Sequence, residues 1–496
     1  MKKVRPKDSL IVFLIVLLAY GYFFTGSDAN TNSRLALVRA VVEQDRFEID
    51  SFLNTSLPTG DRAYFHGHYY SDKAIGSSVF GVLPYVILLS GEDLLHRFLS
   101  ILAFKELLTF LVVGIISAIL APLVYLFTKQ VTESRWYALL ITAGICLGTP
   151  YYVYSTMYYG HTLAGLFLFS AFYTWFEARA KDKINLVMTI GSGFFLGLAV
   201  ITEYPTLLIV LLIGLYIAYI LLKSSQLRNW KNPVLLVIGA SIPTVVLMAY
   251  NYQIFKTPFA LSYSHESSPD FASIQDSGLM GIHLPNPDVL FYMTFHTTMG
   301  IFWQSPILLF AFADWLNVRK NPRYLPESVL SFAVILLYFG MFSGYQIWWG
   351  GLAFTPRHLI PVLPFFSIPL ALLQKRLQRW VSVPVLFSIG QMFIVTASSR
   401  DGLSSLTRSM HPFYRMFQNS TIYDVYFPNF LSRALSLNWG EEIFRLKGYE
   451  SLIPLFMAEM LLIILFYVYN LGSPYEFFNN RRLTKNNFHQ ESSKHL

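Results

Sequence analysis

The segment PTLLIVLLIGLYIAYILL, residues 205–222, contains no charged side chain. About 20 predominantly apolar residues are needed for a helix to cross the hydrocarbon core of a bilayer, so this segment predicts a membrane span. Similar runs recur along the 496-residue chain, of which 54% is hydrophobic and only 13% is charged. Soluble domains carry about 25% charged residues. The composition therefore excludes a soluble globular protein and a disordered chain, and it predicts an all-α polytopic membrane protein.

Apolar runs separated by basic loops predict twelve membrane spans. One further apolar stretch, residues 77–90, is short for a span and contains Pro84, so we expect a juxtamembrane or re-entrant helix there. With this assignment the short basic loops lie on the same side as both termini, and the positive-inside rule makes that side the cytoplasm. The predicted spans are 9–25, 98–127, 135–150, 161–177, 184–202, 205–222, 232–252, 298–316, 327–345, 357–373, 381–397 and 451–470.

Three long segments then lie outside the cell: residues 25–96, 253–297 and 398–450. The sequence contains no internal repeat and no low-complexity linker. We therefore expect one transmembrane module over residues 1–470, followed by a basic cytoplasmic tail over residues 471–496.

The first outer segment has the most local structure. Apolar residues recur at helical spacing over residues 32–46, which predicts an amphipathic helix on the membrane surface. Asp28 and Thr31 precede this helix and could cap it. Thr59-Gly60-Asp61 predicts a turn.

Charged side chains gather on the predicted outward face. They are Asp28, Asp72 with Lys73, Glu203, and Arg357 with His358. Charge within or beside a membrane is costly, so these residues need an explanation. A carboxylate could accept the proton of an attacking hydroxyl. A lysine and an arginine could stabilise the charge that develops on a phosphate leaving group, so the set suits an anionic lipid headgroup.

Each of these residues also has a structural explanation. Asp28 could be only the N-cap of the surface helix. Asp72 and Lys73 could form a weak surface ion pair. Arg357 could anchor a lipid headgroup, and Glu203 could be an interfacial acid.

Other site types have weaker support. His66 and His68 flank a single glycine, but two imidazoles in a loop do not make a metal site. The sequence contains no glycine-rich phosphate loop, no HExxH motif and no nucleophile elbow. The tyrosines near residues 151–159 are typical of an interfacial aromatic belt, although they could also line a sugar or lipid groove.

Four stretches carry a resemblance to a known family. They are SDANTNSRLA (27–36), GHYYSDKAIG (67–76), GIFWQSP (300–306) and WWGGLAFTPRHLIP (348–361). Together they resemble the bacterial membrane glycosyltransferases of the GT-C fold, in the protein-mannosyltransferase-like group that includes the aminoarabinose transferases. In the second stretch the family more often has proline where Ile75 stands.

The resemblance implies a GT-C-type bundle of about twelve transmembrane helices, with amphipathic juxtamembrane helices in the first outer loop. It implies transfer of a sugar from a polyprenyl-phosphate donor, with inversion, to a glycan, lipid or protein acceptor. The reaction would take place on the outer face of the bacterial cytoplasmic membrane, with no role for nucleic acid. Some family members use a divalent metal ion and others do not, so no metal ligand is predicted.

By the same resemblance, Asp28 corresponds to the catalytic acid-base residue of the first loop. Asp72 and Lys73 correspond to the acid-lysine pair near the donor phosphate, and Arg357 corresponds to the arginine beside the carrier headgroup. Further possible site residues are Glu203, His358 and Arg34.

A transporter or lipid-linked-sugar flippase is the alternative function, because twelve spans are common in transporters. Against it, the sequence contains no pair of interrupted helices in corresponding halves. A purely structural membrane protein would leave the ionic residues of the first loop unexplained. An enzyme should bring Asp28, Lys73 and Arg357 together at the outward end, whereas a transporter should carry its ionic residues near the middle of the membrane.

Overall fold

The computed structural model describes residues 6–26, 28–91, 101–316, 321–351, 353–399 and 421–470. The predicted basic tail at 471–496 lies outside the described residues, as do residues 98–100 of the second predicted span and residues 400–420 of the third outer segment.

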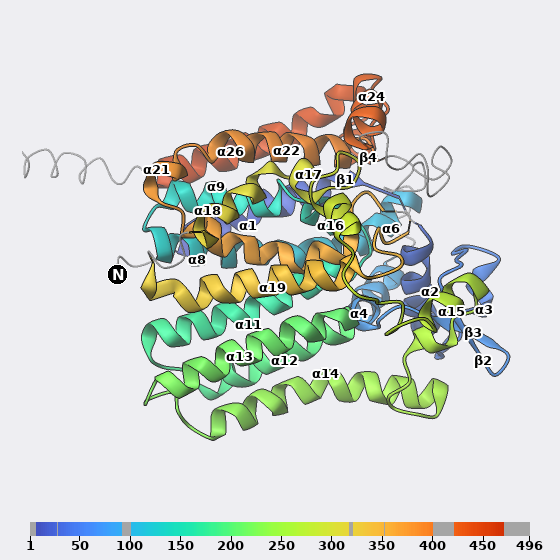
Figure 1. The fold of residues 1–496 in the computed structure, drawn as a ribbon. Coiled ribbons are helices and arrows are strands. Elements are labelled where there is room, and N and C mark those ends of the chain that lie inside the picture. The colour runs from blue at the N-terminus through green and yellow to red at the C-terminus, as the bar shows by residue number, and fades with distance from the viewer. Residues whose placement is uncertain are drawn as a thin grey trace, which may run out of the picture.

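Long helices lie side by side in a bundle (Figure 1). Four consecutive ones are α11 (His161–Lys181), α12 (Leu186–Thr202), α13 (Leu207–Lys223) and α14 (Lys231–Phe255). The backbones of α12 and α14 approach closely at Gly193. A Cβ atom there would lie 2.0 Å from the carbonyl oxygen of Leu236. Small residues permit this close packing between apolar helices, where the hydrophobic effect contributes little inside a membrane.

The remaining elements surround these four helices or cover one end of the bundle. The other helices of ten or more residues are α1 (Pro6–Tyr22), α2 (Ala29–Gln44), α4 (Gly76–Ser90), α8 (Leu120–Thr132), α9 (Arg135–Cys146), α19 (Leu325–Ser343), α22 (Ser382–Ala397) and α26 (Ile453–Asn470). The shorter helices and the strands are α3 (Asp50–Leu53), α6 (Ile101–Thr109), α7 (Ile115–Ala118), α10 (Pro150–Ser155), α15 (Pro269–Gln275), α16 (Pro287–Thr294), α17 (Ile301–Gln304), α18 (Ala311–Trp315), α20 (Ser367–Ala371), α21 (Lys375–Gln378), α24 (Phe427–Leu431), α25 (Trp439–Glu442), β1 (Phe23–Phe24), β2 (Arg62–Phe65), β3 (His68–Ser71) and β4 (Leu437–Asn438).

Every one of the twelve predicted spans contains a helix among the described residues. Among the residues that the structure describes, five helical segments are long and apolar enough to cross a membrane, which confirms a predominantly helical membrane protein. They are Lys105–Thr132, Tyr204–Lys223, Lys231–Phe255, Pro322–Ser343 and Gly448–Tyr469. The count of twelve spans stays a prediction.

Two predicted spans are interrupted at prolines, and a third, 98–127, contains a π-helix over Phe110–Gly114. The segment 298–316 breaks after α17, where Ser305 precedes Pro306 and has a non-helical backbone with φ −140° and ψ 73°. The residue before a proline is driven out of the helical region by steric conflict with the proline ring. In the segment 357–373, a 3₁₀-helix (η7, Arg357–Phe366) contains two internal prolines and precedes α20. Residues 359–366 of η7 are buried in the middle of the bundle.

The first outer segment folds into α2, α3, a β-hairpin and α4. The helix α4 covers the stretch 77–90, and its juxtamembrane or re-entrant placement stays a prediction. The helix α2 begins at Ala29, earlier than predicted, because Asp28 caps it: Oδ1 accepts a hydrogen bond of 2.9 Å from the backbone N–H of Thr31.

The strands correct the all-α prediction. Strands β2 and β3 pair antiparallel across the two-residue loop His66-Gly67, and both loop residues have positive φ, 49° and 91°. Two positive φ values are what a tight type I′ hairpin turn requires, and histidine is among the residues that tolerate this region. A second small sheet pairs β1, at the end of α1, with β4 from the third outer segment.

The two ends of the bundle differ in what they carry. Figure 1 shows α2, α3, α15 and the β2–β3 hairpin together at one end, and α21 at the other. Helix α11 has 21 residues, so at about 1.5 Å per residue its ends lie about 30 Å apart. Arg179 near its far end pairs with Glu327 at 2.8 Å, whereas His161 at its beginning lies 3.1 Å from Glu203, which pairs with Arg34 of the first outer segment. The basic loop 179–183 is therefore remote from that segment.

Candidate active site

Asp28 and Arg357 come together through a tyrosine. Tyr159, between α10 and α11, donates a short hydrogen bond from its phenol to Oδ2 of Asp28. Nη1 of Arg357 donates to the same phenolic oxygen at 3.1 Å, and the guanidinium carbon lies 5.3 Å from the centre of the tyrosine ring. Because Thr31 occupies Oδ1, both oxygens of the Asp28 carboxylate are held in place. Asp28 thus caps the helix α2 and also contacts Tyr159, which joins it to Arg357.

The stretch 348–361 positions Arg357 through a glycine. Gly350 has a φ of +80°, and a Cβ atom there would lie 2.8 Å from Cγ of Arg357 and 3.1 Å from its Nε. The bend at Gly350 therefore lets the backbone lie against the arginine side chain. The Nε–H of Arg357 is buried and has no hydrogen-bond partner among the described residues. Such a donor favours an incoming acceptor.

The hairpin builds a second cluster around Lys73. Arg62 of β2 pairs with Ser71 of β3, so Asp61 and Asp72 extend beyond the same end of the hairpin. Nζ of Lys73 lies 2.9 Å from Oδ2 of Asp61 and 2.7 Å from Oδ2 of Asp72. Asp72 is only 2% exposed and Lys73 8%, so the surface-ion-pair explanation is wrong for this pair.

Burial and neighbouring charges shift the pKa values of Lys73 and Asp61 in opposite directions. Burial lowers the pKa of Lys73, but Asp61 and Asp72 outweigh it and leave that pKa raised. Burial raises the pKa of Asp61, but the positive charges of Lys73, Arg357 and Arg34 outweigh it and leave that pKa lowered. Arg357 therefore acts on the Lys73 cluster as well as on Tyr159.

Residues of the second outer segment contact the same cluster. The backbone of Glu266 forms an isolated antiparallel β-bridge with Ala63 of β2, and its side chain forms a hydrogen bond with Asp72. Ser262 Oγ donates to the Asp72 carbonyl oxygen at 2.7 Å. Burial, followed by the charge of Asp72, raises the pKa of Glu266 to about 8, so the two carboxyl groups share a proton near neutral pH.

Arg34 and Glu203 form a third, buried part of the site. Arg34 is 2% exposed, and its Nη2 donates to Oε1 of Glu203 at 3.2 Å. Nδ1 of His161 lies 3.1 Å from the same carboxylate oxygen. Burial acts to raise the pKa of Glu203, but His161 and Arg34 outweigh it and bring that pKa down to about 2. Glu203 is therefore an ionised, buried partner of Arg34 rather than an interfacial acid.

His358 joins the third part from the start of η7. Its ring lies 5.8 Å from that of His161 and stacks on Phe342 at 4.8 Å. The residues predicted as possible site members thus all lie at one end of the bundle, in three neighbouring clusters. They are Asp28, Arg34, Asp72, Lys73, Glu203, Arg357 and His358.

Sequence reasoning missed four members of these clusters. Tyr159 belongs to a group of tyrosines interpreted as an aromatic belt, and no local pattern distinguishes it. Asp61 was assigned only to a turn, although the His66-Gly67 turn signal could have shown that a hairpin sets it beside Lys73. His161 and Glu266 reach the site from distant parts of the chain, which sequence spacing cannot reveal.

The acidic residues do not suit a divalent metal ion. Asp61 and Asp72 converge on Nζ of Lys73, so an ammonium group stands where a cation would be held. Within the described ranges, no group of three or more His, Cys, Asp or Glu side chains is arranged to bind a metal. His68 contacts Asp50 at 3.4 Å, away from these clusters.

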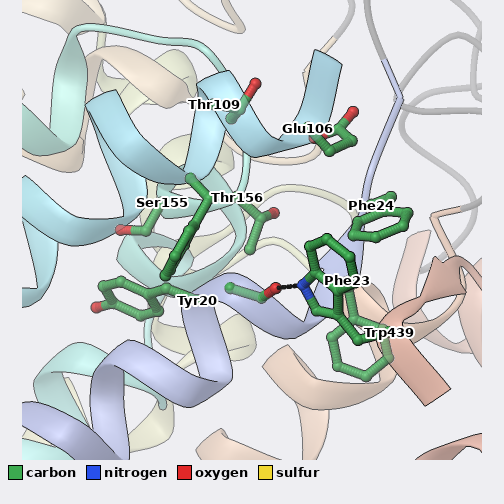
Figure 2. Close-up of a pocket in the computed structure, with 10 residues that line it drawn as sticks. Tyr20, Phe23, Phe24, Glu106, Thr109, Ser155, Thr156 and Trp439 are labelled. Carbon is green, nitrogen blue, oxygen red and sulfur yellow. Dashed lines mark hydrogen bonds between the residues drawn. The ribbon is translucent and has the colours of Figure 1, made fainter. Parts of the chain in front are cut away.

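A small cavity lies behind the segment that leads into Asp28 (Figure 2). Its lining includes Phe23 and Phe24 at the end of α1, Glu106 of α6, and Trp439, whose Nε1 donates to the carbonyl oxygen of Gly21 at 2.6 Å. None of the predicted site residues lines this cavity. The predicted residues form a polar network, and the cavity is a separate feature.

A comparison with protein-family models agrees with the resemblance seen in the sequence. Residues 61–261 match the family model described as dolichyl-phosphate-mannose-protein mannosyltransferase. This match confirms the resemblance to the protein-mannosyltransferase-like group over those residues and supports a glycosyltransferase. The matched segment contains Asp72, Lys73 and Glu203, whereas Asp28 and Arg357 lie outside it.

The solved structures that are similar to the chain at low identity include two states of one protein. ArnT from Cupriavidus metallidurans bound to undecaprenyl phosphate aligns with a TM-score of 0.46 and 12% identity, over 92% of this chain and 75% of that one. The apo state of the same protein aligns with a TM-score of 0.43 and 13% identity, over 92% and 74%. No curated protein sequence is significantly similar to the chain.

Proposed function

We propose that this protein transfers a sugar from a polyprenyl-phosphate-linked donor to an acceptor at the extracytoplasmic face of the membrane, with inversion at the anomeric carbon. The observation that carries the proposal is the joining of Asp28 to Arg357 through Tyr159, beside the buried ion cluster of Lys73. A carboxylate and two cations at one end of an apolar bundle suit a charged headgroup whose lipid tail remains in the bilayer. The family match over residues 61–261 supports the same class of donor.

In the proposed reaction Asp28 is the general base. The acceptor hydroxyl attacks the anomeric carbon and forms the new C–O bond while its proton passes to a carboxylate oxygen of Asp28. The bond between the anomeric carbon and the phosphate oxygen breaks, and its electron pair leaves with the polyprenyl phosphate. Inversion follows because the hydroxyl attacks opposite the leaving phosphate.

Arg357 and Lys73 stabilise the leaving phosphate in this proposal. The unpartnered Nε–H of Arg357 is available to a phosphate oxygen, and a guanidinium can bind phosphate through two parallel hydrogen bonds. Lys73 has three N–H donors, of which Asp61 and Asp72 take two. Asp72 therefore serves to hold and orient Lys73, and its own carboxylate stays away from the phosphate.

The remaining proposals follow from the same arrangement. The protein lies in the bacterial cytoplasmic membrane as a GT-C-type module of about twelve spans, with the first loop outside and both termini in the cytoplasm. The remoteness of the basic loop 179–183 from the polar clusters supports this orientation, because basic loops favour the cytoplasmic side. Arg34 lies on α2 and Lys73 follows β3, two elements at one end of the bundle (Figure 1), as expected for an enzyme rather than a flippase.

The experiment is sugar transfer by the purified full chain in lipid nanodiscs, supplied with a panel of polyprenyl-phosphate sugars. Wild type should release free polyprenyl phosphate, and Lys73→Met should release it about tenfold to a thousandfold more slowly, because one electrostatic donor is lost. Movement of labelled lipid between leaflets without consumption of any donor would contradict the transferase function and favour the flippase function.

A further inference from the structure

Tyr159 is held rigidly between the two groups that the proposed reaction needs most. The side chain is fully buried, and its ring packs edge-on against Tyr154 at 5.4 Å and stacks on His161 at 5.7 Å. These contacts leave the phenol one direction in which to point. It donates to Asp28 and accepts from Arg357, so a single hydroxyl connects the carboxylate to the guanidinium.

This connection makes the hydrogen bond at Asp28 depend on the contacts of Arg357. A hydrogen bond donated to a carboxylate stabilises its ionised form and so weakens it as a base. The phenol is a stronger donor while the cation of Arg357 polarises its oxygen, because hydrogen bonds in a chain reinforce one another. A phosphate bound at the free Nε–H of Arg357 draws on the same positive charge, so the polarisation of the phenol weakens and its hydrogen bond to Asp28 weakens with it.

We propose that Tyr159 is a positioning residue that couples occupation of the phosphate position at Arg357 to the proton affinity of Asp28. This inference rests on the proposed function. The device links the hydrogen bond at the Asp28 carboxylate to the engagement of a donor headgroup by Arg357. The acceptor proton still goes to Asp28, and Tyr159 exchanges no proton with substrate.

The first test compares Tyr159→Phe with Tyr158→Phe in the full chain reconstituted in nanodiscs. Tyr158 is an apt control, because it is also fully buried but donates to the Ser77 carbonyl oxygen at 3.0 Å. Removing the Tyr159 hydroxyl should move the acid limb of the pH–rate profile for donor consumption upward by about one pH unit, since a hydrogen bond to a charged group is lost. Tyr158→Phe should leave that limb in place. An unmoved acid limb in Tyr159→Phe would overturn the proposal.

The second test does not need activity, so it separates this inference from the proposed function. Infrared spectra record the protonated carboxyl band that is lost in Asp28→Asn, while pH is varied with and without undecaprenyl phosphate as the probe. In wild type the probe should move the midpoint of this band upward by about one pH unit, and in Tyr159→Phe by less than half of that.

The outcomes are distinct. Tyr159→Phe should still bind undecaprenyl phosphate within about threefold of wild type, because Arg357 and Lys73 are intact. Loss of binding would overturn the proposal by making Tyr159 part of the phosphate site. An equal probe-dependent movement in wild type and Tyr159→Phe would overturn it as well. If wild type consumes no donor, the proposed function fails while the infrared comparison still decides the coupling.

Discussion

Replacing Glu203 with glutamine should lower the free energy of unfolding by about 3 kcal/mol at pH 7. Glu203 is 7% exposed and lies between Arg34 and His161. Burial alone would raise its pKa, but the partners bring it from an ordinary 4.5 to about 2. A depression of about 2.5 pH units corresponds to about 3 kcal/mol of interaction with the ionised carboxylate. Breaking a buried ion pair by removing one partner costs a similar amount, about 3–5 kcal/mol.

The sign of the pH dependence follows from the lowered pKa. A carboxylate whose pKa is lower in the folded protein contributes stability above its unfolded pKa, and this contribution is lost as pH falls through the folded pKa. The difference between wild type and Glu203→Gln should therefore be complete above about pH 4.5 and should shrink toward zero near pH 2.

The assay is equilibrium unfolding in mixed lipid–detergent micelles, followed by tryptophan fluorescence at several pH values. Glu177→Gln is the matched control, because Glu177 pairs with Lys181 one turn along the same helix surface and such pairs contribute at most about 1 kcal/mol. The reasoning is refuted if Glu203→Gln differs from wild type no more than Glu177→Gln does, or if its effect at pH 3 equals its effect at pH 7.

Two further predictions concern the neighbouring clusters. Gly350→Ala should push Arg357 aside and reduce donor consumption by about tenfold or more, because the added Cβ would lie 2.8 Å from Cγ of Arg357 at a φ of +80°. The control is Gly340→Ala, which should keep the wild-type rate because nothing lies within 4 Å of the added Cβ. Equal rates of donor consumption in Gly350→Ala and Gly340→Ala would contradict this account. Raising the pH through about 8 should ionise Glu266 beside Asp72, so hydrogen-exchange protection of residues 262–268 should fall above that pH and not below it. Glu266→Gln should remove this pH dependence, and its persistence in that variant would exclude Glu266 as the cause.

The sequence was a good guide to the helices because their signal is local. Uncharged runs predict spans from length and composition alone, and each predicted span contains a helix among the described residues. The short helix α4 was also predictable, since residues 77–90 are too few to cross a bilayer. The breaks at Ser305 and in η7 could have been expected from the prolines, which override apolar composition locally.

The site was only partly predictable, because its contacts join distant residues. Charge on the outward face was enough to single out Asp28, Lys73, Arg357 and Glu203, since ions near a membrane are costly. Which ion pairs with which depends on the hairpin and on the bundle. Lys73 was expected beside Asp72 alone, but the β2–β3 register brings Asp61 to it as well.

The tyrosine at the centre of the site shows the same limit more sharply. Five tyrosines between residues 151 and 159 look alike in the sequence. Only the packing of Tyr154 and His161 around Tyr159 aims its hydroxyl at Asp28. Aromatic composition predicts an interface, whereas the direction of a single phenol requires the fold.

The most direct measurement is the release of polyprenyl phosphate from a polyprenyl-phosphate sugar by the purified chain, comparing wild type, Asp28→Asn and Asp270→Asn. Asp270 is an exposed acid at the start of α15 in the second outer segment, so it controls for the loss of one outward carboxylate. The account predicts that Asp28→Asn, shown to be folded by an unchanged unfolding transition, is slower by about 10²–10⁴-fold, while Asp270→Asn matches wild type. Equal rates in folded Asp28→Asn and wild type would contradict the assignment of the base.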